Sequence, residues 1–219
     1  MDLKMPMPGK VLNRMIVTAV EELSKSKSKV YIDGEFAFVL YKGELRLYHI
    51  CIGKEMENAD YIEIMEKMLT KRARMRAMHL LTKKDYTEKQ LSDKLKQGLY
   101  PQEVIQDALQ YVAGFHYTDD LRFAVGYITD HVSSRSRLRI EQDLLQKGIK
   151  RDTLEQAWLE WENRGGEQDE ASMIINLIEK RGICWKQADQ KERHKVYRYL
   201  LGKGFSGETI QKALRSEDL

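Results

Sequence analysis

Few prolines and cysteines interrupt or cross-link this chain. Only three of the 219 residues are proline, and none lies between Pro8 and Pro101 or after Pro101. Because proline breaks helices from within, long stretches of the chain are free to be helical. The two cysteines, Cys51 and Cys184, are far apart and outside any motif, which excludes a disulfide framework and favours a reducing compartment.

Long apolar segments are missing as well. No N-terminal run has the length of a signal peptide, and nothing approaches the roughly 20 apolar residues of a membrane-spanning helix. We therefore expect a cytoplasmic protein that does not associate with membranes. Residues 1–8 contain two prolines and show no periodicity, so we expect them to be frayed or partly disordered.

A large charge imbalance is absent too, although the charge is unevenly distributed. The 37 basic and 34 acidic residues leave a net charge of +3, which is too small to indicate nucleic-acid binding by itself. Residues 67–110 carry 10 basic and 5 acidic side chains, whereas residues 111–219 carry 18 of each. The basic excess is therefore confined to one region.

The strongest positive signal is a unit of about 50 residues that occurs three times. Residues 91–109, 140–158 and 196–214 superpose with offsets of 49 and 56 residues, which brings their apolar positions into register. Such recurrence is typical of repeat arrays, whose long surfaces usually hold a macromolecule rather than a small substrate. The aligned apolar anchors that we expect in the core are Leu144, Leu154, Trp158, Leu200, Ile210 and Leu214.

Apolar spacing within each unit predicts three helices. The first helices are expected at about 73–82, 120–132 and 169–180, the second at 88–97, 136–146 and 190–202, and the third at 101–112, 152–162 and 207–215. Thr87 with Gln90, and Asp152 with Glu155, match the capping-box pattern of a helix start.

Glycines mark the ends of the second helices. Gly148 and Gly204 each follow a Leu-x-Lys sequence, where a left-handed residue is needed to end the helix. In the first unit we expect Gly98 to have this role, one residue earlier than in the other two.

The N-terminal region has a different pattern, and we expect residues 14–56 to form strands. Asp33-Gly34 between two apolar runs predicts a tight hairpin with a two-residue loop. In that register Tyr31 faces Phe36, and Phe38 is expected on the same side, which would give the small sheet an aromatic face to bury.

These patterns together predict a mostly α fold. We expect a tandem array of three three-helix repeats, elongated and curved, preceded by a small β-rich N-terminal segment. The predicted boundaries are 1–58 for the β-rich segment, then 59–116, 117–165 and 166–219 for the first, second and third helical repeats.

No group of residues indicates catalysis. The five histidines are scattered, and His49 with Cys51 would supply only half of a metal site. Asp119 and Asp120 precede a helical run, where capping and compensation of the helix dipole are the favoured roles. We therefore predict no enzymatic activity and no metal or other cofactor.

Two basic clusters are the candidate contact sites for a macromolecule. The predicted contact residues are Arg72, Arg74 and Arg76 in the first repeat and Arg135, Arg137, Arg139 and Lys147 in the second. Basic density without matching acids is the reason for this choice. The simpler alternative, a solvated helix face, stays open for each of these residues.

The repeats resemble the RecX family of bacterial recombinase regulators. The resemblance covers about residues 28–215 and is carried by Asp120-x-x-Phe123-Ala124-x-x-Tyr127, then Arg135, then Ile140-x-x-x-Leu144-x-x-Lys147-Gly148-Ile149. The third repeat echoes this with Leu200-x-x-Lys203-Gly204-Phe205, and residues 30–38 look like the extra β-rich segment of longer members.

The resemblance implies a monomeric regulator that binds the RecA recombinase filament on single-stranded DNA. Such a regulator restrains the ATPase, strand-exchange and coprotease activities of RecA, with at most a weak contact to the DNA strand. A DNA-binding helical module that acts without RecA is the alternative, because three-helix units can present a helix to a groove. A small-molecule enzyme ranks last, since no nucleophile or base is evident.

Overall fold

The computed structural model describes residues 14–217, so the segment 1–8, expected to be frayed, lies outside it. The chain divides into two compact units. The first comprises residues up to Leu80 together with Ser92–Gly114, and the second comprises Leu81–Leu91 and the chain from Phe115 onward. No helix in residues 14–217 is long and apolar enough to cross a membrane.

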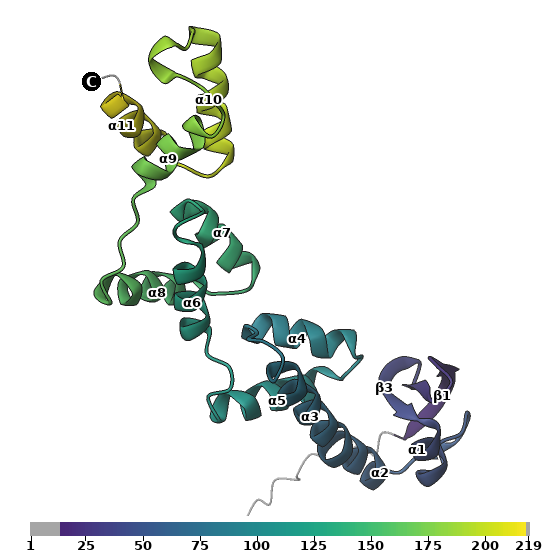
Figure 1. The fold of residues 1–219 in the computed structure, drawn as a ribbon. Coiled ribbons are helices and arrows are strands. Elements are labelled where there is room, and N and C mark those ends of the chain that lie inside the picture. Colours follow the sequence, from purple (N-terminus) through teal and green to yellow (C-terminus); the bar gives the residue numbers. More distant parts are fainter. Residues whose placement is uncertain (1–13, 218–219) are drawn as a thin grey trace, which may run out of the picture. The chain divides into compact units, whose positions relative to one another are not determined.

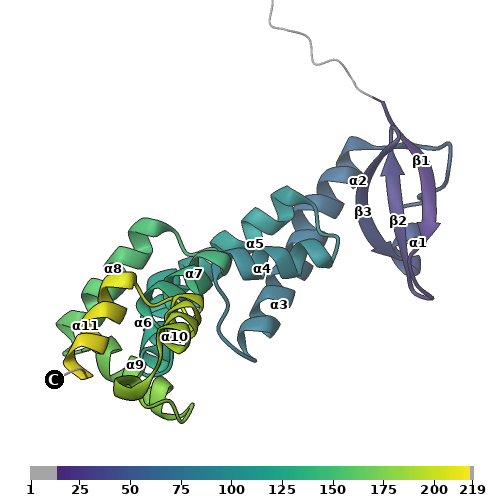
Figure 2. The same cartoon turned by 90° about the horizontal axis from the view of Figure 1, so that it is seen from above.

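The first unit contains a small antiparallel sheet. Its strands are β1 (Met15–Glu22), β2 (Lys27–Ile32), β3 (Glu35–Tyr41) and the two-residue β4 (Glu55–Met56), in the order β3-β2-β1-β4. Figure 2 shows β1, β2 and β3 side by side. Burial alternates strictly along β2, as expected for a sheet with one face against a core.

The predicted hairpin forms, but its aromatic face does not. Asp33 and Gly34 have φ angles of 51° and 88°, and Tyr31 pairs with Phe36 as predicted. The register then shifts, because Val30 pairs with Phe38, so β3 contains a bulge. One extra residue turns the following side chain to the other face. Phe38 is therefore fully buried while Phe36 is 39% exposed, and the expectation that they share a side is wrong.

The prediction of strands across 14–56 is also wrong between β3 and β4. Residues Lys42–Leu47 form a short helix, α1. The Glu44 carboxylate accepts a hydrogen bond from the backbone N–H of Tyr41 at 2.7 Å, which satisfies an amide at the helix start. This local cap favours a helical turn over further pairing with the sheet.

The helical part of the first unit shares one core with the sheet. Helix α2 (Asn58–Ile62), the π-helical segment η1 (Glu63–Leu69) and α3 (Thr70–Leu81) follow one another directly, and α4 (Glu88–Gln97) and α5 (Gln102–Gly114) follow them. Phe38 and Leu40 of the sheet lie in the same buried cluster as Ile64, Leu95 and Ile105. The sheet thus closes the core of the first repeat.

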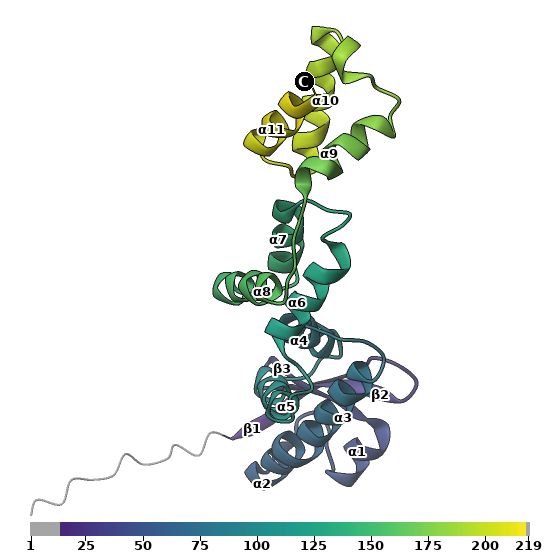
Figure 3. The same cartoon turned by 60° about the vertical axis from the view of Figure 1, so that its left-hand side comes forward.

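Each of the next two repeats has three helices and its own core. The second repeat contains α6 (Asp120–His131), α7 (Arg137–Gln146) and α8 (Arg151–Asn163), as Figure 1 shows. The third contains α9 (Glu170–Glu179), the short 3₁₀ turn η2 (Trp185–Gln187), α10 (Gln190–Gly202) and α11 (Gly207–Glu217). Figure 3 shows α9, α10 and α11 close together, and their buried side chains form a separate core.

The predicted fold class is confirmed: the chain is mostly helical, with three three-helix repeats after a small sheet. The elongated, curved arrangement and the four domain boundaries stay predictions. The aligned anchors are all in the core, with exposed fractions of 0–6% for Leu144, Leu154, Trp158, Leu200, Ile210 and Leu214.

One of the two predicted capping boxes is present. The Thr87 hydroxyl accepts from the Gln90 N–H at 3.1 Å, and the Gln90 side chain accepts from the Thr87 N–H at 3.3 Å. The Asp152–Glu155 box is wrong, because α8 begins at Arg151 after an N-cap at Lys150. Asp152 therefore lies within the first turn, where its charge can still favour the helix dipole.

The helix-ending residues are left-handed in all three repeats, but only two are glycine. Gly148 and Gly204 have φ angles of 94° and 88°, as predicted. In the first repeat the left-handed residue is Leu99, with φ 59°, so the prediction for Gly98 is wrong. Gly98 is explained by space instead, since a Cβ there would lie 2.9 Å from the Tyr100 ring.

A buried hydroxyl links the start of α4 to the second repeat. The Thr87 side chain is fully buried and donates to the Lys147 carbonyl at 2.6 Å. The next backbone N–H, of Glu88, donates to the Asp120 carboxylate at 2.9 Å. The N-terminal amides and the cap of one helix are thereby satisfied by the following repeat.

The same joint recurs between the second and third repeats. The Ser136 hydroxyl, in a residue only 1% exposed, donates to the Lys203 carbonyl at 2.9 Å, and the Arg137 N–H donates to the Glu170 carboxylate at 2.6 Å. In both joints the accepting carbonyl belongs to the lysine that precedes the left-handed glycine. A repeated sequence thus produces a repeated contact.

Two features of the joint require glycine at positions 148 and 204. A Cβ on Gly148 would lie 2.3 Å from the Cβ of Lys89, and one on Gly204 would lie 2.6 Å from the Ser136 hydroxyl. Positive φ alone favours glycine, and the close approach of the preceding segment disfavours even the methyl group of alanine.

We predict that Gly148→Ala destabilises the second unit by more than the ~1–2 kcal/mol that a left-handed alanine costs. The matched control is Gly165→Ala, because Gly165 has a similar φ of 86° but no atom within 4 Å of the point that a Cβ would occupy. Urea unfolding of both variants measures the difference. Equal losses would contradict the claim that the Lys89 segment packs against Gly148.

Candidate partner-binding surface

Two of the predicted contact arginines hold the first unit together. Arg72 of α3 forms an ion pair with Glu44 of α1, and its guanidinium lies 4.7 Å from the centre of the Tyr41 ring. Its side chain is only 23% exposed. Arg72 therefore fastens α3 to the end of the sheet, and a partner would have to compete for a guanidinium that is already paired.

Arg74 has a similar structural role toward α5. Its Nε and Nη2 atoms donate to the two carboxylate oxygens of Asp107 at 2.6 and 2.8 Å, and it stacks on the Tyr111 ring at 4.6 Å. The hydrogen bond to Asp107 raises the pKa of Arg74 above its ordinary value. This two-pronged geometry is the strong form of the arginine–carboxylate pair.

Arg76 differs from its two neighbours. It is exposed, and among residues 14–217 it has no hydrogen-bond or ion-pair partner. Met75 beside it is 58% exposed, and Lys71 one turn earlier is exposed as well. In the first cluster, Arg76 is thus the cation available to a partner without loss of an internal contact.

The second cluster is organised around one buried carboxylate, Asp143 of α7. Arg135 donates to it at 2.7 Å, Arg139 lies 3.3 Å from it, and the Tyr127 hydroxyl donates to it at 3.3 Å. Arg135 also donates to the Tyr127 oxygen at 2.7 Å. The network joins α6, the loop after it and α7.

Lys147 completes this group from the end of α7. Its ammonium lies 5.2 Å from the centre of the Tyr127 ring. Arg135 and Arg139 therefore pair with one carboxylate, and their side chains are 40% and 54% exposed. Two arginines on a single carboxylate leave a local positive excess, and the remaining N–H groups can bind a carboxylate or phosphate of a partner.

Aromatic rings cover the α6 side of this group. Phe123, Tyr127 and His131 are one helical turn apart, and successive ring centres lie 6.3 and 4.0 Å apart with nearly parallel planes. Burial raises the pKa of Tyr127, and the charge of Asp143 raises it further, while Arg135 acts in the opposite direction. Tyr127 is thus held neutral as the donor to Asp143.

Arg137 does not join the other three predicted residues of its repeat. It forms ion pairs with Glu141 at 3.2 Å and Glu162 at 3.0 Å, and its guanidinium lies 4.3 Å from the centre of the Trp158 ring. It therefore braces α7 against α8. Its predicted role as a contact residue stays untested, like those of the other six.

A further basic surface was missed from the sequence. Helix α10 carries four Lys or Arg residues and one acid, Glu192. Its exposed basic side chains are Lys191, His194, Lys195 and Arg198. Residues 111–219 carry equal numbers of basic and acidic side chains in total, so the excess on α10 does not show in that total. Counting the charges of each helix separately would have found it.

Within residues 14–217, no three His, Cys, Asp or Glu side chains come together as ligands for a metal ion. The polar groups described above are ion pairs and helix caps rather than an arrangement of nucleophile and base.

Comparisons with known proteins match all three repeats. Models of the first, second and third three-helix domains of RecX match residues 73–111, 119–157 and 168–214. The regulatory protein RecX of Caldanaerobacter subterraneus subsp. tengcongensis is 32% identical over 91% of this chain and 98% of its own. That of Clostridium acetobutylicum is 26% identical over 91% of this chain and 94% of its own.

Solved structures share the fold. A crystal structure of regulatory protein RecX is similar over 90% of this chain and 99% of its own, with a TM-score of 0.58 at 23% identity. The structure of RecX from Lactobacillus salivarius covers 68% of this chain and 97% of its own, with a TM-score of 0.55 at 18% identity.

We predict that Asp143→Asn lowers the pKa of Tyr127, because it removes a negative charge that raises this pKa and leaves Arg135 unopposed. Tyrosine-selective NMR across a pH titration measures the change. Glu141→Gln is the control, since Glu141 pairs with Arg137 outside the network and should leave Tyr127 unaffected. An unchanged Tyr127 pKa in Asp143→Asn would show that the network is not formed in solution.

Proposed function

The chain belongs to the RecX family, and on this premise we propose that it binds the RecA recombinase filament on single-stranded DNA and inhibits its activities. The activities concerned are ATP hydrolysis, strand exchange and the coprotease function. The observation that carries the proposal is the match of three successive RecX modules together with a relative that is 32% identical over almost the full chain.

A binding role is supported by the way in which the repeats are joined. The two joints at Thr87 and Ser136 connect neighbouring helices through buried hydrogen bonds. Modules joined in series can contact several positions of a regular polymer at once, and linked contacts gain affinity from their effective concentration. We propose that the protein acts as a cytoplasmic monomer, by occupancy of the filament rather than by catalysis.

The proposed contact residues differ in how readily they can bind a partner. Arg76 is unpaired within the described chain, Arg135 and Arg139 share one carboxylate, and the Lys147 ammonium lies over the Tyr127 ring. We propose these four as the principal contacts. The other three proposed contacts, Arg72, Arg74 and Arg137, each have acidic partners of their own.

The exposed basic face of α10 favours a second candidate function, direct binding of DNA without RecA. Clustered lysine and arginine side chains attract phosphates electrostatically, and this attraction does not depend on the DNA sequence. The two functions differ in which component of the filament, protein or nucleic acid, the chain contacts.

We predict that the purified protein slows ATP hydrolysis by RecA on single-stranded DNA, and that Arg76→Glu raises the half-inhibitory concentration about 10-fold through loss of a charge contact. Lys67→Glu is the matched control, because Lys67 is also exposed in the helical run that leads into α3 but is not a proposed contact. No slowing by the wild-type protein over a broad titration would refute the proposed function. Equal effects of the two variants would refute the role of Arg76 alone.

A further inference from the structure

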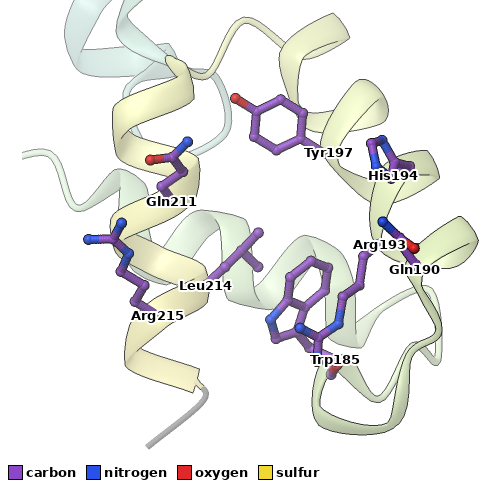
Figure 4. Close-up of a pocket in the computed structure, with 8 residues that line it drawn as sticks. All are labelled: Trp185, Gln190, Arg193, His194, Tyr197, Gln211, Leu214 and Arg215. Atoms are coloured by element: carbon purple, nitrogen blue, oxygen red, sulfur yellow. Dashed lines mark hydrogen bonds between the residues drawn. The ribbon is translucent and has the colours of Figure 1, made fainter.

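The third repeat contains a pocket that none of the contacts proposed above uses. It has a volume of about 460 Å³ and opens between α10 and α11 beside η2, as Figure 4 shows. This volume lies within the range of ordinary ligand sites. The pocket lies within one repeat, so its shape depends on a single core.

The base of the pocket is apolar. Leu214 of α11 belongs to the core of the third repeat, and Trp185 and Tyr197 pack against that core. The indole N–H of Trp185 is buried and finds no acceptor among residues 14–217. Because this nitrogen has almost no accessible surface, it does not itself face a ligand in the pocket.

The pocket is lined by two arginines and a histidine, Arg193, Arg215 and His194. None of its lining residues is acidic among the side chains that the structure describes. Arg193 is already engaged, since it donates to the carbonyls of Ala188 and Trp185 and lies 4.9 Å from the centre of the Trp185 ring. It therefore positions the tryptophan.

Arg215 and His194 are available to a ligand. Both are exposed, and Arg215 has no hydrogen-bond or ion-pair partner in the part of the chain that the structure describes. The two side chains come from opposite walls, α11 and α10 (Figure 4). A second hollow, of about 540 Å³, shares His194 with the pocket and is bordered by Lys191 and Arg198. Its one acid, Asp189, is used as the N-cap of α10.

Two kinds of macromolecule carry negative charge and apolar surface, namely an acidic protein segment and single-stranded nucleic acid. A nucleobase binds by stacking on an open aromatic face. The Trp185 ring is already stacked against Arg193 and packed on the core. The pocket therefore suits an aliphatic or aromatic side chain that enters from a peptide better than it suits a base.

We infer that this pocket binds an acidic segment of the partner protein, which inserts an apolar side chain over Leu214 and places carboxylates beside Arg215 and His194. The exposed amide of Gln211, on the same wall as Arg215, can bond the peptide backbone. The inference rests on the proposed function for the identity of the partner, which would be the regulated recombinase. Binding of the peptide itself can be tested without that protein.

The test measures binding of the full chain to fluorescein-labelled probes by fluorescence anisotropy. The main probe is a synthetic 16-residue amphipathic peptide of glutamate and leucine, and the comparison probes are the same peptide with glutamine for glutamate and a 16-nucleotide oligothymidylate. We expect the glutamate peptide to bind at least about 10-fold more tightly than either comparison probe, as charge-assisted contacts require. Tighter binding of the oligothymidylate would overturn the inference in favour of nucleic acid.

Two pocket variants and one control locate the site. Arg215→Glu reverses the free charge, and Gln211→Trp fills the pocket from an exposed position, so both should fold and bind the glutamate peptide at least about 10-fold more weakly. Lys212→Glu makes the same charge change on α11 itself, at an exposed residue that does not line the pocket, and should change affinity by less than about 3-fold. Equal losses in Lys212→Glu and Arg215→Glu would overturn the inference.

The same variants separate this inference from the proposed function. If the wild-type protein binds the peptide but does not slow ATP hydrolysis by RecA, the proposed function fails and the pocket stands as a peptide site. If the wild-type protein and Arg215→Glu inhibit RecA equally, the pocket has no part in regulation and the inference fails, while the proposed function stands.

Discussion

The structure of the second unit depends on one repeated interaction, in which a buried hydroxyl at the start of a helix donates to the carbonyl before a left-handed glycine in the following repeat. Thr87 and Ser136 are the donors, and Gly148 and Gly204 leave the space. Both hydrogen bonds lie within the second unit and add buried polar contacts to the small cores of its repeats. The glycines are therefore fixed both by backbone conformation and by the neighbouring repeat.

Much of the fold could be predicted because its signals are local. Apolar spacing located the three helices of each repeat, and Asp33-Gly34 located the hairpin. The wrong predictions concern places where one local sequence pattern is compatible with more than one backbone structure. A bulge in β3 placed Phe38 on the opposite face of the sheet from Phe36. In the first repeat, Leu99 has the left-handed conformation that glycine adopts at lower cost, although Gly98 is next to it.

The candidate site was less predictable, because ion pairs join residues far apart in the sequence. Arg74 and Asp107 are 33 residues apart, and nothing local shows that one neutralises the other. Counting charges along the chain identified basic segments but could not separate arginines that brace the fold from a free one such as Arg76. The cationic face of α10 was hidden in a balanced total, although it borders the pocket that we assign to an acidic peptide.

Recognition of the RecA protein, rather than of its DNA, is the central claim, and binding measured over a series of salt concentrations tests it most directly. The targets are RecA filaments on single-stranded DNA, RecA without nucleotide, and bare single-stranded DNA. If contacts to phosphates dominate, the logarithm of the affinity falls with the logarithm of the salt concentration by about 0.7 for each phosphate contacted on a single strand. We predict preferential binding to the filament, a shallow slope and poor competition by bare DNA. Tight and steeply salt-dependent binding to bare DNA would contradict the account.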